Sequence, residues 1–257
     1  MNVYLYIRNN AEKAAALIKA KLAECKISVV DNIDSADIGI AVGGDGTLLR
    51  LAGKAMEKDI PVLGINAGRV GFLTCLELSE IDGPAGLGGL SRLLTGEYRT
   101  TNRSLLSLEL NGESYTALND IVFSKDTTAP LVDFLLRREL TEENPIHFRS
   151  DGLIFATPTG STGYALSAGG PVIDPSLAGV LVTPICPHSL SARSVIFSDD
   201  KAFWLSADET PVNVFADGQH IGKLNGGGTA QIKKSAKTVK LIDFGRDFYR
   251  VIREKLI

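Results

Sequence analysis

The segment from 43 to 47 combines residue types that suit phosphoryl transfer. It reads Gly-Gly-Asp-Gly-Thr, directly after the apolar run Ile38–Val42 and before a helical pattern. Glycines leave the backbone open to a phosphate, and the free N–H groups at the start of a helix favour an anion. Asp45 would repel a phosphate unless it binds a metal or accepts a proton from the reacting group. We therefore interpret this turn as a phosphate-binding turn that carries its own base.

A plain strand-to-helix turn, with Asp45 as a helix cap, is the alternative for this segment. Its glycines, Gly43, Gly44 and Gly46, are more than a cap requires. The sequence contains no Gly-x-x-x-x-Gly-Lys-Ser/Thr, which argues against a P-loop nucleotidase. It also has no Gly-x-Gly-x-x-Gly after the first predicted strand, so the usual fingerprint of redox dinucleotide enzymes is missing.

A second glycine turn runs from Asn66 to Gly71 and is followed by Phe72 and Leu73. On its own this turn is also typical of a structural loop. Paired with the first turn on the same edge of a sheet, it would form a wall of the site. Phe72 offers a flat apolar face for a base, although ordinary core packing explains a phenylalanine equally well.

Asn119 and Asp120 place an amide and a carboxylate inside a β-rich run. Adjacent strand residues face opposite sides, so a strand directs only one of them into a given cleft unless a bulge intervenes. A pair on a turn would explain the two residues equally well.

Two further polar segments are Arg149–Gly152 and Thr157–Tyr164. The second is dense in hydroxyls and glycines, and residues 165–168 then look helical. Backbone N–H groups and hydroxyls suit ribose and phosphate oxygens, and Asp151 suits a ribose diol or a metal. A surface loop rich in serine and threonine is the alternative. We interpret His188 and His220, which lie in predicted turns, as structural.

Strands and helices alternate over residues 1–97, which predicts a doubly wound α/β domain. Ligands of such sheets bind beyond the carboxyl ends of the strands, so we expect the two glycine turns to line one crevice. Residues 82–90 are glycine-rich and are predicted as a loop, before a short helix at 90–94. The predicted strands of this domain are 3–7, 27–30, 38–42 and 61–65, and its other predicted helices are 11–24 and 47 to about 57.

From residue 98 the pattern changes to short alternating runs, separated by turns such as Asn111-Gly112. We predict a β-rich, sandwich-like domain at 98–240. Residues 241–257 end in a helix from Asp247 to Leu256, which we expect to pack back on the first domain. The predicted runs are 104–110, 115–123, 131–137, 146–150, 152–157, 179–183, 194–197, 203–207, 212–216 and 238–242.

Composition narrows the class of protein. The formal net charge is −3 and no basic stripe is present, so neither nucleic-acid binding nor membrane-surface binding is expected. Cys25, Cys75 and Cys186 are scattered without metal spacing, which is typical of reduced thiols in the cytoplasm. The first residues lack a signal-peptide pattern, and no apolar run approaches the length of a membrane span. We therefore expect a soluble cytoplasmic protein.

Taken together, these segments resemble the NAD kinase family. The resemblance rests on the motifs at 43–47, 66–73, 119–120, 149–152 and 157–171, in this order and over most of the chain. The first motif also occurs in lipid kinases and phosphofructokinase-like enzymes, whereas the segment 157–171 is the specific one. The resemblance implies phosphorylation of the adenosine 2′-hydroxyl of NAD to give NADP. It further implies ATP or polyphosphate as donor, a divalent cation (Mg²⁺ or Mn²⁺), and a homodimer or homotetramer.

The resemblance also implies roles for individual residues. Asp45 matches the proton acceptor of the family. The NAD contacts would be Asp45, Gly46, Arg50, Phe72, Asn119, Asp120, Arg149, Asp151, Thr162, Gly163, Tyr164, Ala165, Leu166, Ser167 and Gln219. For the phosphate donor we expect contacts from Gly43, Gly44, Gly46, Thr47, Asn66, Gly68 and Arg69. The metal ligands stay unassigned.

Three positions depart from the family pattern. Asp120 stands where glutamate is usual, Gly163 where alanine is frequent, and Cys75 where aspartate is usual. Two other functions fit parts of the pattern: a kinase of the same superfamily that acts on a lipid or sugar, and a dinucleotide sensor without catalysis. The segment 157–171 argues against the lipid kinase, and Asp45 argues against the sensor.

Overall fold

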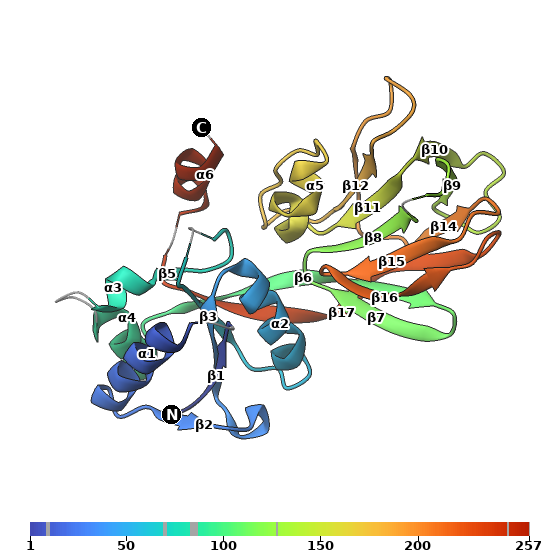
Figure 1. The fold of residues 1–257 in the computed structure, drawn as a ribbon. Coiled ribbons are helices and arrows are strands. Elements are labelled where there is room, and N and C mark those ends of the chain that lie inside the picture. Colours follow the sequence, from blue (N-terminus) through green and yellow to red (C-terminus); the bar gives the residue numbers. More distant parts are fainter. Residues whose placement is uncertain (9–10, 69–70, 83–86, 127, 246, 257) are drawn as a thin grey trace. The chain divides into compact units, whose positions relative to one another are not determined.

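The computed structural model describes residues 1–8, 11–68, 71–82, 87–126, 128–245 and 247–256 (Figure 1). The chain divides into two compact units. The first unit comprises Met1–Arg103 together with Thr238–Ile257, and the second comprises Ser104–Lys237. None of the helices within the described residues is long and apolar enough to cross a membrane.

A parallel sheet forms the centre of the first unit. Its strands lie in the order β2-β1-β3-β4, and the end of β17 pairs with β4 through Leu241 and Val62. All six residues of β3 are buried, as expected for a strand that is covered on both faces. The strands are β1 (Asn2–Ile7), β2 (Ser28–Val30), β3 (Ile38–Gly43), β4 (Val62–Asn66), β5 (Leu76–Glu77), which also pairs with β4, and β17 (Thr229–Asp243).

Helices cover both faces of this sheet (Figure 1). Ile18 of α1 and Leu90 of α4 pack on one face with Ile40, whereas Leu51 of α2 lies against Gly39, the neighbouring strand residue that faces the other way. This arrangement confirms the predicted doubly wound α/β fold. The helices are α1 (Glu12–Glu24), α2 (Asp45–Met56), α3 (Leu78–Asp82), α4 (Leu87–Thr95) and α6 (Phe248–Leu256), with the short 3₁₀ helix η1 (Ile33–Ser35).

Two sheets pack face to face in the second unit and confirm the β-rich, sandwich-like fold. One has the antiparallel order β13-β12-β11-β8-β15-β16. The other contains β10-β9-β14 and the first part of β17, with β6 and β7 attached. The strands are β6 (Arg99–Leu110), β7 (Glu113–Ala117), β8 (Asp120–Lys125), β9 (Val132–Arg137), β10 (Ile146–Ser150), β11 (Gly152–Ala156), β12 (Val180–Ile185), β13 (Val195–Phe197), β14 (Phe203–Ala207), β15 (Val212–Ala216) and β16 (Gln219–Leu224).

Aromatic side chains from both sheets fill the core of this sandwich. The Phe155 ring of β11 lies edge-to-face against Phe123 of β8 and Phe203 of β14, with centroid separations of 6.0 and 5.6 Å. Edge-to-face pairs add to the gain from burying apolar area, so the Phe155–Phe203 pair stabilises the packing of one sheet on the other.

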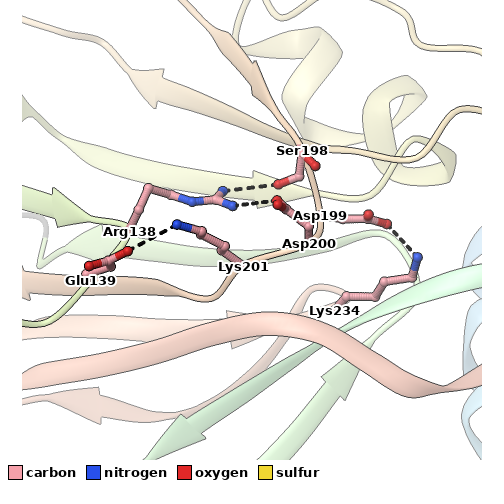
Figure 2. A network of polar contacts seen from close by, with 7 residues as sticks. All are labelled: Arg138, Glu139, Ser198, Asp199, Asp200, Lys201 and Lys234. Atoms are coloured by element: carbon pink, nitrogen blue, oxygen red, sulfur yellow. Dashed lines mark hydrogen bonds and ion pairs between the residues drawn. The ribbon is translucent and has the colours of Figure 1, made fainter.

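A network of polar contacts holds the segment between β13 and β14 in place (Figure 2). The Arg138 guanidinium donates to the Ser198 carbonyl, pairs with Asp200 at 3.1 Å and lies 4.3 Å from the centroid of the Phe203 ring. At the edges of the network, Lys201 pairs with Glu139 at 3.0 Å and Lys234 with Asp199 at 2.7 Å. The Lys201–Glu139 pair is exposed and contributes little to stability, whereas Arg138 also packs on an aromatic face.

Several predicted elements are corrected by the structure. The helix predicted from Thr47 begins at Asp45, which places the carboxylate in the first turn of α2. Within the predicted loop at 82–90, α4 already begins at Leu87, because burial of Leu90 and Leu93 outweighs the helix cost of the glycines. Residues 83–86 lie outside the described part of the chain.

The predicted run at 115–123 breaks into β7 and β8, with Leu118 and Asn119 between them. Two strands, β5 and β16, were missed. The strand β6 begins at Arg99, before its predicted run at 104–110, and β17 begins at Thr229, well before the run predicted at 238–242, because a polar lysine-rich stretch hid its continuity. The Asn111-Gly112 turn is confirmed, with φ of 52° and 85°. The predicted boundaries near 98 and 241 stay predictions, since β6 and β17 each continue from one unit into the other.

Candidate active site

Asp45 joins the two glycine turns of the first unit. It follows the buried end of β3 and lies in the first turn of α2. Its Oδ2 accepts a hydrogen bond of 2.7 Å from the backbone N–H of Phe72, and its Oδ1 accepts one of 3.0 Å from that of Leu73. The two turns therefore lie together at the carboxyl edge of the sheet, as the sequence predicted.

The glycines of these turns fall into two groups. A Cβ on Gly71 would lie 2.1 Å from Asp45 Oδ1, and a Cβ on Gly43 would lie 2.2 Å from the Thr47 hydroxyl oxygen. These two positions exclude any side chain for reasons of packing. A Cβ on Gly44 or Gly46 would meet nothing within 4 Å, so the backbone of these two residues is open to a ligand. This open backbone is what a phosphate needs at the start of a helix.

A cleft of about 440 Å³ lies beside the open glycines. Arg8 follows the end of β1 and approaches Gly43, while Arg50 lies one helical turn beyond Asp45 on α2. Both arginines are exposed, and neither makes an ion pair with any residue that the structure describes. The cleft thus combines free guanidinium groups with a helix N-terminus, which favours a polyanion. Its lining residues are Tyr6, Ile7, Arg8, Gly44, Gly46, Thr47 and Arg50.

Asn66 shapes the second turn from within. Its side chain is 1% exposed, and its amide nitrogen donates to Glu77 Oε2 at 2.7 Å and to the Gly68 carbonyl at 3.3 Å. The donor group of Asn66 is therefore used inside the protein in this conformation, although Gly68 itself is open. Arg69, which we predicted as a donor contact, lies outside the described residues.

Phe72 is half-buried and faces the C-terminal helix. The ammonium of Lys255 lies 4.1 Å from the centroid of the Phe72 ring, a cation–π contact. Phe248 and Val251 of α6 line a small hollow next to the same ring. One face of Phe72 is therefore occupied by the protein itself, so the core-packing interpretation describes part of its role.

In the second unit, Asn119 lies in the bend between β7 and β8, and Asp120 is the first residue of β8. Asp120 is 5% exposed. Burial, followed by the charge of Asp217, raises the pKa of Asp120 to about 7, and the backbone N–H of Tyr164 acts in the opposite direction. The Asn119 side-chain oxygen is buried and has no hydrogen-bond partner among the described residues. Both groups have the chemistry to accept hydrogen bonds from a ligand.

The polar segment after β11 folds over this pair. Thr157, Thr159 and Ser161 are buried, which rules out the surface-loop alternative. The Thr157 hydroxyl donates to the Leu118 carbonyl at 2.6 Å, and a Cβ on Gly160 would lie 2.0 Å from the Asn119 carbonyl oxygen. The segment contains the 3₁₀ helix η2 (Thr159–Thr162) and the short helix α5 (Tyr164–Ser167).

Gly163 connects this segment to both side chains of the pair. A Cβ on Gly163 would lie 3.3 Å from the Asn119 amide nitrogen and 3.6 Å from Asp120 Oδ2. Along α5, Tyr164 is 47% exposed, whereas Ala165 is fully buried and can offer a ligand only its backbone. The structure therefore gathers Asn119, Asp120 and the predicted contacts Thr162, Gly163, Tyr164, Ala165, Leu166 and Ser167 into one constellation.

Arg149 and Asp151 lie apart from that constellation. Ala156 pairs with Asp120, whereas Gly152, next to Asp151, pairs with Ser124 at the other end of the β8–β11 ladder. At ~3.3 Å per residue the two ends are roughly 13 Å apart. The Asp151 carboxylate forms an ion pair with Lys125 at 3.1 Å, and Arg149 forms one with Asp133 at 3.9 Å.

Gln219 lies at the same end of the sheet as Asp120. It is exposed and follows the turn formed by Asp217 and Gly218, and Ala216, its partner across that hairpin, also pairs with Ile121. His188 and His220 take no part in a metal cluster: no group of three or more histidine, cysteine or acidic side chains within the described residues could hold an ion. His220 instead lies edge-to-face against Phe215.

Sequence reasoning missed two residues at these sites. The sequence around Arg8 does not indicate a functional residue. Arg8 reaches the cleft only because it follows β1, and β1 pairs with β3. Asp217 did carry a local signal, since Asp-Gly is typical of a hairpin, but its contacts with the distant residues Leu118, Asn119 and Asp120 were not foreseen.

Two family models match this chain. The ATP-NAD kinase N-terminal domain matches residues 10–98, and the ATP-NAD kinase C-terminal domain matches residues 118–244. Among curated proteins, the NAD kinase of Caldicellulosiruptor saccharolyticus is 36% identical over 248 residues, which cover 95% of this chain and 92% of the relative. The NAD kinase of Methanothermobacter thermautotrophicus is 38% identical over 232 residues, covering 89% and 78%.

Two solved structures are similar in fold. Yeast NADH kinase complexed with NADH superposes with a TM-score of 0.84 at 20% identity, covering 100% of this chain and 87% of that one. The NAD kinase of Archaeoglobus fulgidus in complex with ATP superposes with a TM-score of 0.80 at 26% identity, covering 99% and 98%. At its low identity, the yeast protein supports the fold alone.

Proposed function

The chain belongs to the NAD kinase family, and we propose that it transfers a phosphoryl group to the adenosine 2′-hydroxyl of NAD, with Asp45 as proton acceptor. The observation that carries this proposal is the Asp45 carboxylate, fixed by the backbone of Phe72 and Leu73 beside the open glycines of α2. A binding turn for phosphate alone has no use for a negative charge at this position.

The cleft beside Gly44 and Gly46 is proposed as the site of the phosphoryl donor, ATP or polyphosphate. The free guanidinium groups of Arg8 and Arg50 would neutralise its phosphates, together with the N–H groups at the start of α2. The ATP bound to the Archaeoglobus fulgidus relative supports ATP for this role. Among the other predicted contacts to the donor, Gly43 and Thr47 shape the first glycine turn. Asn66 and Gly68 shape the second glycine turn, and Arg69 stays a prediction.

A divalent cation, Mg²⁺ or Mn²⁺, belongs to the same proposal. Such ions at nucleotide sites bind mainly to phosphates and water and take only one or two carboxylates from the protein. The open glycine turn leaves room for phosphates to bring the ion, and Asp45 is a carboxylate within reach of that turn. When bound, the cation neutralises charge on the phosphates.

For the acceptor we propose the constellation around Asn119 and Asp120. The orphan oxygen of Asn119 and the Asp120 carboxylate would accept hydrogen bonds from the adenine amino group or the ribose hydroxyls. Gln219 and residues 162–167 are proposed as further contacts, whereas Gly46 and Phe72 stay predictions. Arg149 and Asp151 would contact a different part of the dinucleotide, from the same copy or from another copy in a homodimer or homotetramer.

The proposed reaction is an in-line transfer. The 2′-oxygen of NAD forms a bond to the terminal phosphorus as the bond from that phosphorus to the bridging oxygen of the donor breaks. The hydroxyl proton passes to Asp45, and the shortened donor leaves with the electron pair of the broken bond. The backbone N–H groups of Phe72 and Leu73 orient the Asp45 carboxylate for this step. A cytoplasmic location remains part of the proposal.

One experiment tests this function. The purified protein is incubated with NAD, Mg²⁺ and either ATP or polyphosphate, and NADP is measured with an NADP-specific dehydrogenase. We expect NADP to accumulate with at least one donor. Phosphorylation of diacylglycerol or a sugar in place of NAD, or tight NAD binding without turnover, would contradict the proposal.

A further inference from the structure

Asp217 occupies the first position of the two-residue turn between β15 and β16. Its φ is 46°, and that of Gly218 is 74°. Positive φ at both positions is the type I′ geometry, which asparagine, aspartate and glycine adopt most readily. The turn therefore explains the need for a residue of this kind, but asparagine would satisfy it as well as aspartate does.

The carboxylate of Asp217 binds three consecutive backbone N–H groups at the proposed acceptor site. Its Oδ2 accepts from Leu118 at 2.8 Å, and its Oδ1 accepts from Asn119 at 2.7 Å and from Asp120 at 3.3 Å. In return, the Asp217 N–H donates to the Asp120 carbonyl at 3.0 Å. Hydrogen bonds to an ionised acceptor are roughly twice as strong as neutral ones, so this carboxylate fixes the backbone that carries both side chains of the pair.

This arrangement has an electrostatic cost. Burial raises the pKa of Asp217 despite its three N–H donors, and its negative charge lies beside Asp120, which is itself buried. Like charges in a poorly solvated site disfavour ionisation of both groups. From α5 the group that faces Asp120 is the backbone N–H of Tyr164, and Ala156 of β11, the strand paired with β8, is uncharged. Two neighbouring carboxyl groups in this place indicate that the charge of Asp217 has a use beyond the turn.

Building on the function proposed above, we infer that Asp217 is a positioning residue for the acceptor: it orients Asn119 and Asp120 toward the 157–164 segment and controls the charge of Asp120. An ionised Asp120 accepts hydrogen bonds from NAD, whereas a protonated one loses an acceptor. NAD binding therefore weakens as the pH falls through the titration of Asp120, and removal of the neighbouring charge moves that midpoint to lower pH.

Asp208 offers a matched control in the same unit. It is half-buried like Asp217, its N–H donates to the Asp133 carbonyl at 3.0 Å, and its carboxylate accepts from Asp133 at 3.1 Å and from Thr210 at 2.8 Å. The backbone arrangement is the same as at Asp217 and Asp120. Asp208 differs in that its pKa is lowered. Burial raises the pKa of Asp208, but hydrogen bonds from the N–H groups of Thr210 and Asp133 lower it by more.

The test compares the wild type, D217N and D208N. We measure KM for NAD and for ATP, NAD affinity by calorimetry, and the pH dependence of both between about pH 5.5 and about pH 9. D217N is expected to raise KM and Kd for NAD about tenfold, with KM for ATP changed less than about twofold, and to shift the midpoint to lower pH. D208N should keep the wild-type midpoint, because Asp208 is not among the charges that act on Asp120.

Two results would overturn the inference: unchanged NAD constants and midpoint in folded D217N, or the same shift of the midpoint in D208N. Failure of the proposed function is distinguishable, because the wild type itself would then form no NADP. If D217N does not fold, carboxyl NMR titration of the wild type replaces it. The amide chemical shifts of Leu118 and Asn119 should then change with pH at the midpoint of the Asp217 titration. Amide shifts that do not change there would contradict the inference.

Discussion

The Asp45 carboxylate lies 2.7 Å from the backbone nitrogen of Phe72 and accepts its hydrogen bond, so the acid of the first glycine turn is held by the end of the second. This bond makes the orientation of Asp45 depend on the main chain of 71–73 and not on a neighbouring side chain. Changes in either turn are therefore expected to affect the same chemical step.

Gly71 is the position at which this dependence is most easily tested. A Cβ there would lie 2.1 Å from Asp45 Oδ1, and the Thr74 hydroxyl oxygen is also close, at 2.6 Å. We expect G71A to displace the carboxylate and lower kcat by about 10²-fold, the typical cost of a misplacement near 1 Å. G53A is the control, because Gly53 is exposed on α2 with no atom within 4 Å of its Cβ position. Equal activity of G71A and the wild type would refute this role of the turn.

Arg8 and Arg50 distinguish the donor side of the site from the acceptor side. The family resemblance assigned Arg50 to NAD, whereas the structure places it on the cleft with Gly44, Gly46 and Arg8. We expect R8M and R50M each to raise KM for ATP about tenfold and to leave KM for NAD nearly unchanged, since each removes a charge-assisted contact to phosphate. Steady-state kinetics with each substrate varied in turn will show this. R253M, on an exposed part of α6, is the control. A selective rise in KM for NAD would instead support the assignment of Arg50 to NAD.

The raised pKa of Asp120 makes a prediction about stability. Its folded pKa of about 7 lies above the ordinary value of 3.8, so between these pH values the folded state binds more protons than the unfolded state. Stability therefore falls as the pH rises through this window and is constant, for this group, above it. D120N has no such group, so its free energy of unfolding should rise relative to the wild type from about pH 4 to about pH 7.

Urea denaturation of both proteins across this range measures the difference. A gap between D120N and the wild type that stays constant with pH would show that Asp120 titrates at its ordinary value. Because Asp120 is also proposed to bind NAD, activity is not used as the readout here.

Local patterns were sufficient to predict most of the fold. The apolar run of β3, the glycines after it and the helical spacing of Leu48 and Leu51 lie within a few residues of one another, and each is visible in the sequence. The helix start was misplaced by two residues, since capping glycines leave no side-chain signal. The polar middle of β17 hid a long strand, because its pairing partners come from other parts of the chain.

The candidate site was predicted only where its chemistry is local. Asp45 and its glycines were found because an acid among glycines is unusual in itself. The role of Asp217 could not be found in this way, since it contacts Leu118 across 99 positions of sequence. The same holds for Asp151: its distance from Asp120 follows from the antiparallel register of β8 and β11, which no single segment encodes.

The central claim is that Asp45 accepts the proton, and D45N tests it most directly. General-base assistance contributes about 10²–10⁴-fold, so we predict a fall in kcat of that size, with Kd for NAD by calorimetry kept within about threefold. D37N is the control, because Asp37 also holds a backbone N–H, that of Asn2 at 2.7 Å, and precedes β3, whereas Asp45 follows the other end of this strand. A D45N protein that binds NAD and forms NADP at close to the wild-type rate would contradict the account.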